Sequence, residues 1–517
     1  MRLRSRLRVS SEPGFWIRII LIVTLSLSLG LNLSPAASAA QGLVDRVIEH
    51  KLANGLTVLL VERHQAPIVS INVTFGVGGV NELTGATGIA HLYEHMAFKG
   101  TRTVGTKDYA QEKPLLDELD RLNAEIETKR AAGASARELE PLQQSFKAAQ
   151  ERADQLVVGN EMSMLYQRHG AVGLNASTGK DITRYVIALP ANRLPLWAAI
   201  ESDRMACPVL REFYKERAVV MEERRLRTDD SPNGLLYEAF AAAAFQAHPY
   251  GFPTIGWASD IQALTPGETD KFFRTYYGPA NATIAIVGDI DPKDTLALIE
   301  RTFGAIPAAP APPPVITAEP PQRGERRVEV EFDAETIVLI GWHKPALSHP
   351  DDFIFDVLES VLADGVTSRL YHALVREKRV ATAVGADAGF PGVIAPNLFV
   401  VSAAPLAPHT TAEIEAVVYE EIERLKTEPV PAKELEKVLN NLDAGLVRAL
   451  RSNGGLAGQL AYFQTVAKDW RYVLKAREKI AAVTPADIQR AARTYFTKNN
   501  RTVATLVRAP KNVKREG

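Results

Sequence analysis

Hydrophobic and polar positions along the chain predict strands, then helices, then strands again. The β-branched run Ile68–Thr74 predicts a strand, and the Asn54-Gly55 pair before it is typical of a hairpin turn. Further along, an amphipathic helical stretch is followed by the apolar run Thr283–Val287, which predicts another strand. This order of elements indicates an α+β arrangement in layers.

A second pattern, between about residues 107 and 161, has helical spacing. Apolar residues recur at the a and d positions of a heptad, and the pattern breaks at Gly133 before it resumes. These positions are Leu115, Leu119, Leu122, Ile126, Leu142, Phe146, Ala149 and Leu156. We expect an antiparallel helical hairpin that packs against the protein or contacts a partner. A membrane-surface role is less favoured, because acidic and basic residues mix on its polar face.

Prolines divide the chain into two halves. The run from Pro307 to Pro321 is rich in proline, which fixes φ and cannot sustain a helix or sheet pairing. It predicts an extended linker over residues 306–326. We therefore expect an N-terminal domain over residues 40–305, a C-terminal domain over residues 327–510 and a tail over residues 511–517.

The two halves share a pattern of residues, which predicts a tandem duplication. Matches recur at a constant offset of 219 residues, beginning with Thr265 and Thr484. The matched segments are Thr265-Pro266, Arg274–Tyr277, Asn281 and Thr283 in the first half, and Thr484-Pro485, Arg493–Phe496, Asn500 and Thr502 in the second. Each copy predicts a helix that begins at Thr-Pro, a turn and an apolar strand.

The N-terminus matches a secretory signal peptide. Arginines between Arg2 and Arg18 precede an apolar stretch from Ile19 to Leu33 and the small-residue motif Ala37-Ser-Ala39. We expect residues 1–39 to be removed and the mature chain to be periplasmic. The alternative is an uncleaved membrane anchor, which the shortness of the apolar stretch and its serines disfavour.

Composition limits the classes of function. The formal net charge is −1 and 46% of the residues are hydrophobic, so no nucleic acid or other polyanionic partner is indicated. The mature length suits two or more globular domains. The single cysteine, Cys207, cannot form an internal disulfide, so apolar burial must stabilise an exported chain of this kind.

The segment His91-Leu-Tyr-Glu94-His95 predicts a metal site with a built-in base. Positions four apart lie on one face of a helix, so both imidazoles can bind one ion, with Glu94 beside it as a proton acceptor. This pattern is typical of a zinc hydrolase. The alternative for the segment taken alone is a solvated amphipathic helix.

The residues around this motif, from Gly85 to Thr101, resemble the signature of the pitrilysin/insulinase family of zinc peptidases. A catalytic zinc takes three protein ligands and keeps one position open. The resemblance implies that Glu223 is the third ligand, after His91 and His95, of one Zn²⁺ per chain. Glu216 lies two helical turns earlier on the same face, and its carboxylate is expected to stand behind the ligands and orient them. Glu222 is the alternative ligand if the helix register differs.

The resemblance covers nearly all of the mature chain and implies the fold: two similar tandem domains, each an antiparallel sheet covered by helices. The expected helical hairpin departs from the family pattern. It falls between His95 and Glu223, which are 128 residues apart, farther than is usual in the family. We therefore interpret the hairpin as an insertion in the first domain.

The resemblance also implies where substrate binds. Family members hold their substrate as an added strand, and Asn175, Ala176 and Ser177 match the edge strand that binds it. In the second domain the family places an arginine and, seven residues later, a tyrosine against the substrate backbone. Arg376 matches the arginine, whereas Ala383 stands at the tyrosine position. This departure favours a heterodimer with a related subunit that lacks zinc, and a homodimer is the alternative.

Together these observations predict an exported zinc metalloendopeptidase that hydrolyses unfolded or short polypeptides, with Glu94 as its catalytic base. The alternative is a non-catalytic structural or binding subunit that has kept the motif. A purely structural zinc is disfavoured, because such a site has four protein ligands and no base beside it.

Overall fold

The computed structural model describes Gly42 and residues 45–508. The predicted signal segment, residues 1–39, and the predicted tail, residues 511–517, lie outside the described residues. Within the described part of the chain, no helix combines the length and the apolar character needed to span a bilayer.

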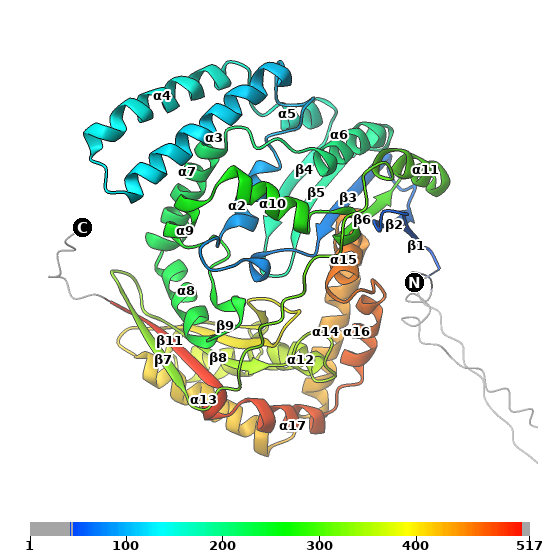
Figure 1. Ribbon diagram of the computed structural model, residues 1–517. Helices are drawn as coiled ribbons and strands as arrows, with labels where there is room; N and C mark the ends of the chain where they lie inside the picture. Colours follow the sequence, from blue (N-terminus) through cyan, green and yellow to red (C-terminus); the bar gives the residue numbers. More distant parts are fainter. Residues whose placement is uncertain (1–41, 43–44, 509–517) are drawn as a thin grey trace, which may run out of the picture. The chain divides into compact units, whose positions relative to one another are not determined.

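Six strands of the first half form one sheet in the order β1-β2-β6-β3-β5-β4 (Figure 1). They are β1 Ile48–Lys51, β2 Thr57–Glu62, β3 Ile68–Phe75, β4 Val172–Thr178, β5 Thr183–Pro190 and β6 Ala282–Gly288. The predicted strands at Ile68–Thr74 and Thr283–Val287 correspond to β3 and β6, at the centre of this sheet. The turn at Asn54-Gly55 joins β1 to β2, with Gly55 at a φ of 92°.

Five strands of the second half form another sheet, in the order β7-β11-β8-β10-β9. They are β7 Arg326–Phe332, β8 Ile337–Lys344, β9 Ala381–Phe390, β10 Asn397–Pro405 and β11 Arg501–Arg508. The two-domain α+β fold is therefore confirmed.

The sheets are mainly antiparallel, as expected, but each sheet contains one parallel pair. β6 runs parallel to β2, and β11 runs parallel to β7. The last strand of each half inserts between two early strands that run in opposite directions, so it must be parallel to one of them. β6 is antiparallel to β3 and β11 to β8.

Helices cover the inner face of the first sheet. Alternate residues of β3, namely Val69, Ile71, Val73 and Phe75, enter an apolar core with residues from these helices. Apart from α8 Pro232–Ala244, the helices of the first half outside the insertion are α2 Ile89–Met96, α5 Glu161–Arg168, α6 Leu194–Ala206, α7 Phe213–Arg224, α9 Ala258–Ala263, α10 Pro266–Tyr276 and α11 Pro292–Phe303. α2 packs against α7, α10 and β4, which places it beside the edge of the sheet.

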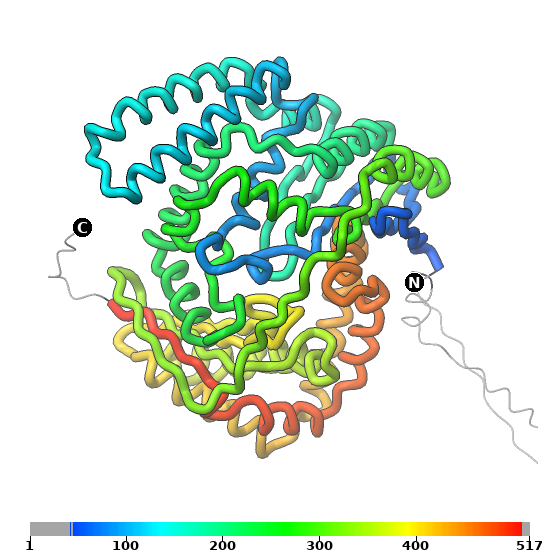
Figure 2. The backbone as a smooth tube through the Cα atoms, in the orientation of Figure 1, coloured from blue at the N-terminus to red at the C-terminus, as the bar shows by residue number. Residues whose placement is uncertain are grey.

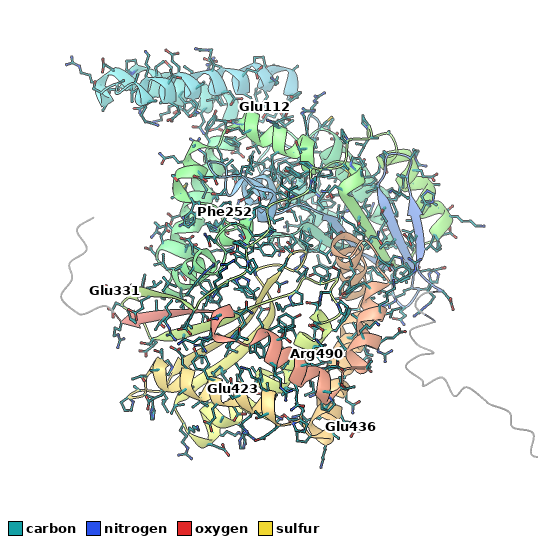
Figure 3. All side chains as sticks on the ribbon, turned by 60° about the horizontal axis from the view of Figure 1, so that its bottom comes forward. Glu112, Phe252, Glu331, Glu423, Glu436 and Arg490 are labelled. Carbon is teal, nitrogen blue, oxygen red and sulfur yellow. The ribbon has the colours of Figure 1, made fainter. Side chains whose placement is uncertain are left out.

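The segment expected to be a helical hairpin forms α3 Tyr109–Ala131 and α4 Ala136–Asp154, which pack against each other. Leu119, Leu122 and Ala149 are buried between them, as the heptad pattern predicts, and Gly133 at the turn has a φ of 82°. Leu156, which the pattern also included, follows the end of α4. In Figure 3, Glu112 lies where the hairpin meets the rest of the first half.

The second sheet has its own core. Trp342, Phe355, Phe399 and Phe496 are buried together in it, with ring centroids 5.1 to 6.0 Å apart. Its helices are α12 Asp352–Ala363, α13 Thr411–Thr427, α14 Ala432–Arg451, α16 Tyr472–Ala481 and α17 Pro485–Tyr495.

Two helices are exchanged between the halves. α8 Pro232–Ala244 precedes the linker but packs on β7 and β11, whereas α15 Asn453–Val466 packs on β3 and β6 (Figure 1). The buried side chain of Phe240 lies among Leu339 and Val400 of the second sheet. A boundary at the linker therefore does not separate two independent cores.

The proline-rich segment, residues 307–323, carries neither helix nor strand. Figure 2 shows it in green, passing from α11 to β7. The carboxylate of Glu319 accepts the backbone N–H groups of Gln246, Ala247 and His248 just after α8. The segment is therefore extended, as its composition predicts, and is tied to the first half.

The duplication is visible in matching hydrogen bonds. Thr265 and Thr484 cap α10 and α17, each accepting an N–H group three residues later. Asn281 donates its side-chain amide to the carbonyls of Tyr276 and Gly76, and Asn500 donates to those of Tyr495 and His343. The matched residues thus close each half in the same way.

Candidate metal centre

The helix that carries the two histidines, α2, has a strongly specified start. Gly88 has a φ of 86°, and a Cβ there would lie 2.5 Å from the carbonyl oxygen of Ile255, so only glycine fits. The buried carboxylate of Glu82 accepts the backbone N–H groups of Gly88 and Ala90, each at 2.9 Å.

His91 and His95 lie one turn apart on α2, with ring centroids separated by 4.9 Å. The Nε2 atom of His91 is 3.7 Å from Oε2 of Glu223, and the Nε2 atom of His95 is 3.3 Å from the same oxygen. The candidate ligand atoms of the three residues all lie within 4.8 Å of one another. Two imidazoles and one carboxylate therefore converge on a single point.

α7 presents two carboxylates toward α2. Glu223 faces both histidines, and Oε2 of Glu216 lies 3.3 Å from Nδ1 of His95, behind the ring. Glu222 is exposed and pairs with Arg225 on the same helix face. Among the three glutamates, the geometry thus brings Glu223 to the histidines and turns Glu222 away from them.

The donor set fits zinc. Burial lowers the pKa of His91 to about 3, so its imidazole is neutral and can donate a lone pair. Burial also lowers the pKa of His95, but Glu216, Glu223 and Glu94 together raise it above its ordinary value. The carboxylates around His95 thus favour positive charge at this place, and the same carboxylates would favour a metal cation bound between the three residues. Two His and one Glu are a donor set typical of catalytic zinc sites, which keep their fourth position for water.

Glu94 lies beside this cluster and is held by a strand. The hydroxyl of Thr178, at the end of β4, donates to Oε2 of Glu94 at 2.7 Å. Burial raises the pKa of Glu94 above its ordinary value, and the hydrogen bond from Thr178 opposes part of that shift. A carboxylate with a raised pKa at this place is suited to accept and return a proton.

The expected substrate strand is β4. Among the described strands it pairs with β5 alone, so its other side is an edge of the sheet. Asn175 and Ala176 line a cavity of about 300 Å³ together with Glu94 and His95. The hydroxyl of Ser177 instead accepts a hydrogen bond from Nε of Arg184 on β5, at 2.9 Å.

Arg376 is exposed in the helical turn Tyr371–Glu377 of the second half, and Ala383 is exposed in β9. Neither residue lines the cavity beside Glu94. The structure of this chain therefore brings together the three predicted zinc ligands, Glu94, Glu216, Asn175 and Ala176, but leaves Arg376 outside that cluster.

Three residues at the site were not singled out from the sequence. Thr178 ends the Asn175-Ala-Ser-Thr178 segment, and only its position in the sheet reveals the contact with Glu94. Lys99 lies one turn beyond His95 and pairs with Glu216 at 2.5 Å. Glu82 holds the start of α2. Helical spacing after His95 was the one signal available for Lys99.

Two family models match this chain. The model described as Insulinase (Peptidase family M16) matches residues 57–128, and the model described as Peptidase M16 inactive domain matches residues 263–442. The zinc protease PqqE of Helicobacter pylori is 29% identical over 497 residues, which cover 94% of this chain and 96% of that protein.

Solved structures share the fold. A protease from Helicobacter pylori superposes with a TM-score of 0.75 at 28% identity, covering 89% of this chain and 99% of that one. The periplasmic protease PqqL of Escherichia coli has a TM-score of 0.67 at 17% identity, covering 90% of this chain but 48% of that one. The resemblance found around His91 and His95 is thus confirmed, and the chain belongs to the insulinase family, peptidase family M16.

Proposed function

We propose that the chain is a zinc-dependent endopeptidase that hydrolyses unfolded or short polypeptides. The observation that carries this proposal is the convergence of His91, His95 and Glu223 on one point, with Glu94 beside it. The zinc protease PqqE, similar over nearly the whole chain, supports the same activity.

Each residue of this cluster would have a separate role in the reaction. His91, His95 and Glu223 would hold one Zn²⁺, and Glu216 would keep the ring of His95 oriented. Bound zinc supplies a Lewis acid that polarises a carbonyl and lowers the pKa of water. Glu94 takes the proton from the attacking water at Oε1 or Oε2 and returns it to the leaving amine. Thr178 holds the carboxylate of Glu94 in place for both transfers.

The edge of β4 supports a substrate in extended conformation. An added strand would pair its backbone with residues such as Asn175 and Ala176, next to the cavity that Glu94 and His95 line. Pairing through the main chain depends on few side chains of the substrate. It requires a substrate segment without secondary structure of its own. Ser177 would contribute through its backbone, because its hydroxyl already accepts from Arg184.

We propose that the protein is exported to the periplasm. The basic and apolar N-terminal segment, residues 1–39, supports removal by a signal peptidase, and the periplasmic PqqL has a similar fold. An uncleaved segment would instead anchor the protein to the membrane. N-terminal sequencing of the protein recovered from its native compartment distinguishes the two forms.

We propose further that the chain works in a pair. Ala383 cannot donate a hydrogen bond, so Arg376 has no tyrosine partner for the substrate backbone. This chain covers 48% of PqqL and 92% of its separately solved first half, so that protein joins one such unit to a further stretch of chain. A related subunit without zinc would supply the missing contacts here. Full peptide turnover by the purified chain alone, with a homodimer mass in light scattering, would exclude the heterodimer.

The activity is tested with the chain lacking residues 1–39. We expect about one zinc per chain and turnover of a quenched fluorescent peptide without secondary structure, lost with a chelator and restored by zinc. Assays are run alone and with the related subunit. A zinc-loaded chain that cleaves no unstructured peptide under either condition would support the alternative of a non-catalytic subunit.

A further inference from the structure

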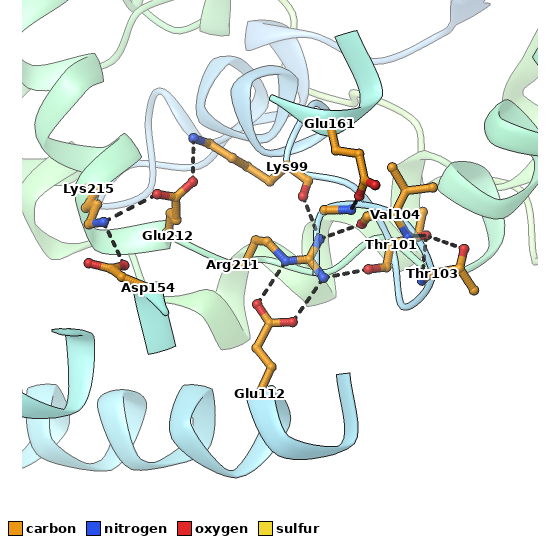
Figure 4. Close-up of polar contacts among 11 residues, drawn as sticks. Lys99, Thr101, Thr103, Val104, Glu112, Asp154, Glu161, Arg211, Glu212 and Lys215 are labelled. Atoms are coloured by element: carbon orange, nitrogen blue, oxygen red, sulfur yellow. Dashed lines mark hydrogen bonds and ion pairs between the residues drawn. The ribbon is translucent and has the colours of Figure 1, made fainter. Parts of the chain in front are cut away.

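The inserted hairpin contacts the region of the metal site through a set of buried and half-buried polar side chains (Figure 4). The hairpin supplies none of the proposed zinc ligands. Two chains of contacts nevertheless lead from it to Lys99, which lies four residues after His95, just beyond the end of α2.

The first chain begins with a buried ion pair between α3 and the segment before α7. Glu112 and Arg211 have 0% and 1% of their side-chain surface exposed. Nε of Arg211 donates to Glu112 at 2.9 Å, and a terminal nitrogen donates to the second carboxylate oxygen at 3.1 Å. Such a paired arrangement fixes both partners, and loss of one leaves an uncompensated buried charge.

Arg211 also holds the loop that follows α2. Its guanidinium donates to three carbonyl oxygens, those of Lys99, Thr101 and Val104, at 2.5, 2.5 and 3.0 Å. Gly100 and Gly105 make room for it, since a Cβ would lie 3.0 and 2.8 Å from its terminal nitrogen. Arg211 therefore holds the loop in place through its hydrogen bonds, and Glu112 of the hairpin compensates the charge of Arg211.

Lys99 connects this loop to the proposed ligands. Its Nζ atom lies 2.5 Å from Oε1 of Glu216 and 3.1 Å from Oε2 of Glu212. The other oxygen of Glu216 lies 3.3 Å from Nδ1 of His95. Lys99 thus holds one oxygen of the carboxylate whose second oxygen orients the imidazole.

The second chain begins on α4. Nζ of Lys215 lies 2.7 Å from Asp154 and 3.3 Å from Glu212, which in turn contacts Lys99. Lys215 and Asp154 are each more than one third exposed, so water screens this pair and its effect is smaller. The two chains of contacts meet at Lys99.

We propose that the inserted hairpin positions the metal site. Glu112 acts through Arg211 and Lys99 to hold Glu216 against His95, so the hairpin contributes to metal affinity without touching the metal. This inference rests on the proposed zinc centre, and it makes Glu112, Arg211 and Lys99 positioning residues.

Zinc affinity measured by competition with a chromogenic chelator tests the proposal. We expect Lys99→Met to weaken zinc binding about tenfold and Glu112→Gln, which acts through further contacts, roughly threefold. Lys99→Arg keeps the charge and should restore most of the affinity. Arg369→Met is the matched control, because it removes a similar half-buried pair, with Glu434, in the second half.

Absorption of the cobalt-substituted protein provides a second measurement, since the visible bands of Co²⁺ report ligand geometry. All proteins are compared at a temperature at which their melting curves show them folded. We expect altered bands for Lys99→Met and Glu112→Gln but not for Arg369→Met. A merely structural role would lower the melting temperature and leave zinc affinity and the cobalt bands unchanged, which would overturn the proposal.

Equal losses of zinc affinity in Arg369→Met would also overturn it, because the effect would then be general. A shortened hairpin, with residues 125–142 replaced by a turn, retains Glu112 and Asp154 and should keep full zinc affinity. Loss of affinity on this shortening would contradict the assignment to Glu112. An unaltered chain that binds no zinc would instead overturn the proposed function itself.

Discussion

The Oε2 atom of Glu223 lies 3.3 Å from Nε2 of His95, although 128 residues separate the two along the chain. α2 packs against α7, and this contact brings a carboxylate from one helix to the imidazoles of the other. The donor atoms therefore converge only in the folded first half. The proposed zinc binding would consequently be coupled to folding of this half.

Glu223→Gln should weaken zinc binding at least tenfold, because an amide oxygen is a much poorer zinc ligand than a carboxylate. Glu222→Gln is the matched control, since Glu222 is exposed and pairs with Arg225 instead. Both are measured by chelator competition. Loss of zinc in Glu222→Gln but not in Glu223→Gln would mean that the helix presents the other carboxylate to the metal.

Glu94→Gln should retain about one zinc per chain while hydrolysis of an unstructured peptide falls about 10²-fold or more, because the proton acceptor is lost and the ligands remain. Thr178→Val removes the hydroxyl that holds Glu94 and should lower kcat by a smaller factor, about tenfold. Zinc content and peptide turnover are measured on the same preparations. Metal loss in Glu94→Gln would assign Glu94 a structural role.

Gly341→Ala should destabilise the protein, because a Cβ at Gly341 of β8 would lie 2.5 Å from the ring of Phe240 on α8. Overpacking of this kind costs about 1–3 kcal/mol. Phe240→Leu in the same chain should recover part of that loss by freeing space. Urea unfolding followed by circular dichroism measures both. Since α8 comes from the first half, full stability of Gly341→Ala would argue against tight packing between the halves.

The second half should lose stability as the pH rises from about 4 to about 7. Burial, and then the charge of Asp352, raise the pKa of Asp356 to about 7. Through Asp356 the folded chain binds more protons than the unfolded chain in this window, so the free energy of unfolding falls as the pH rises. This one group contributes at most about 1.4 kcal/mol per pH unit.

Asp356→Asn should reduce this pH dependence, measured by urea unfolding of the zinc-free protein at several pH values. It should not abolish it, because burial also raises the pKa of Glu359 to about 7. Glu436→Gln, at an exposed position of α14, should leave the dependence unchanged. An unchanged slope in Asp356→Asn would show that Asp356 titrates normally in the folded state.

Local patterns in the sequence were sufficient to predict individual helices and strands. β-branched residues marked β3, heptad spacing marked α3 and α4, and Thr-Pro pairs marked the starts of α10 and α17. The spacing of His91 and His95 was sufficient to predict that both imidazoles share one helix face, because helical periodicity acts over a few residues. Family resemblance, rather than spacing, pointed to Glu223.

The tertiary structure alone decided which groups meet across long separations. Three such features have no repeating pattern in the sequence that would predict them. They are the exchange of α8 and α15, the hydrogen bond from Thr178 to Glu94, and the buried ion pair of Glu112 with Arg211. Each depends on two surfaces that become neighbours only after the sheets and helices pack. Packing has no period along the chain, because it is set by shape and by the cost of burying unpaired charge.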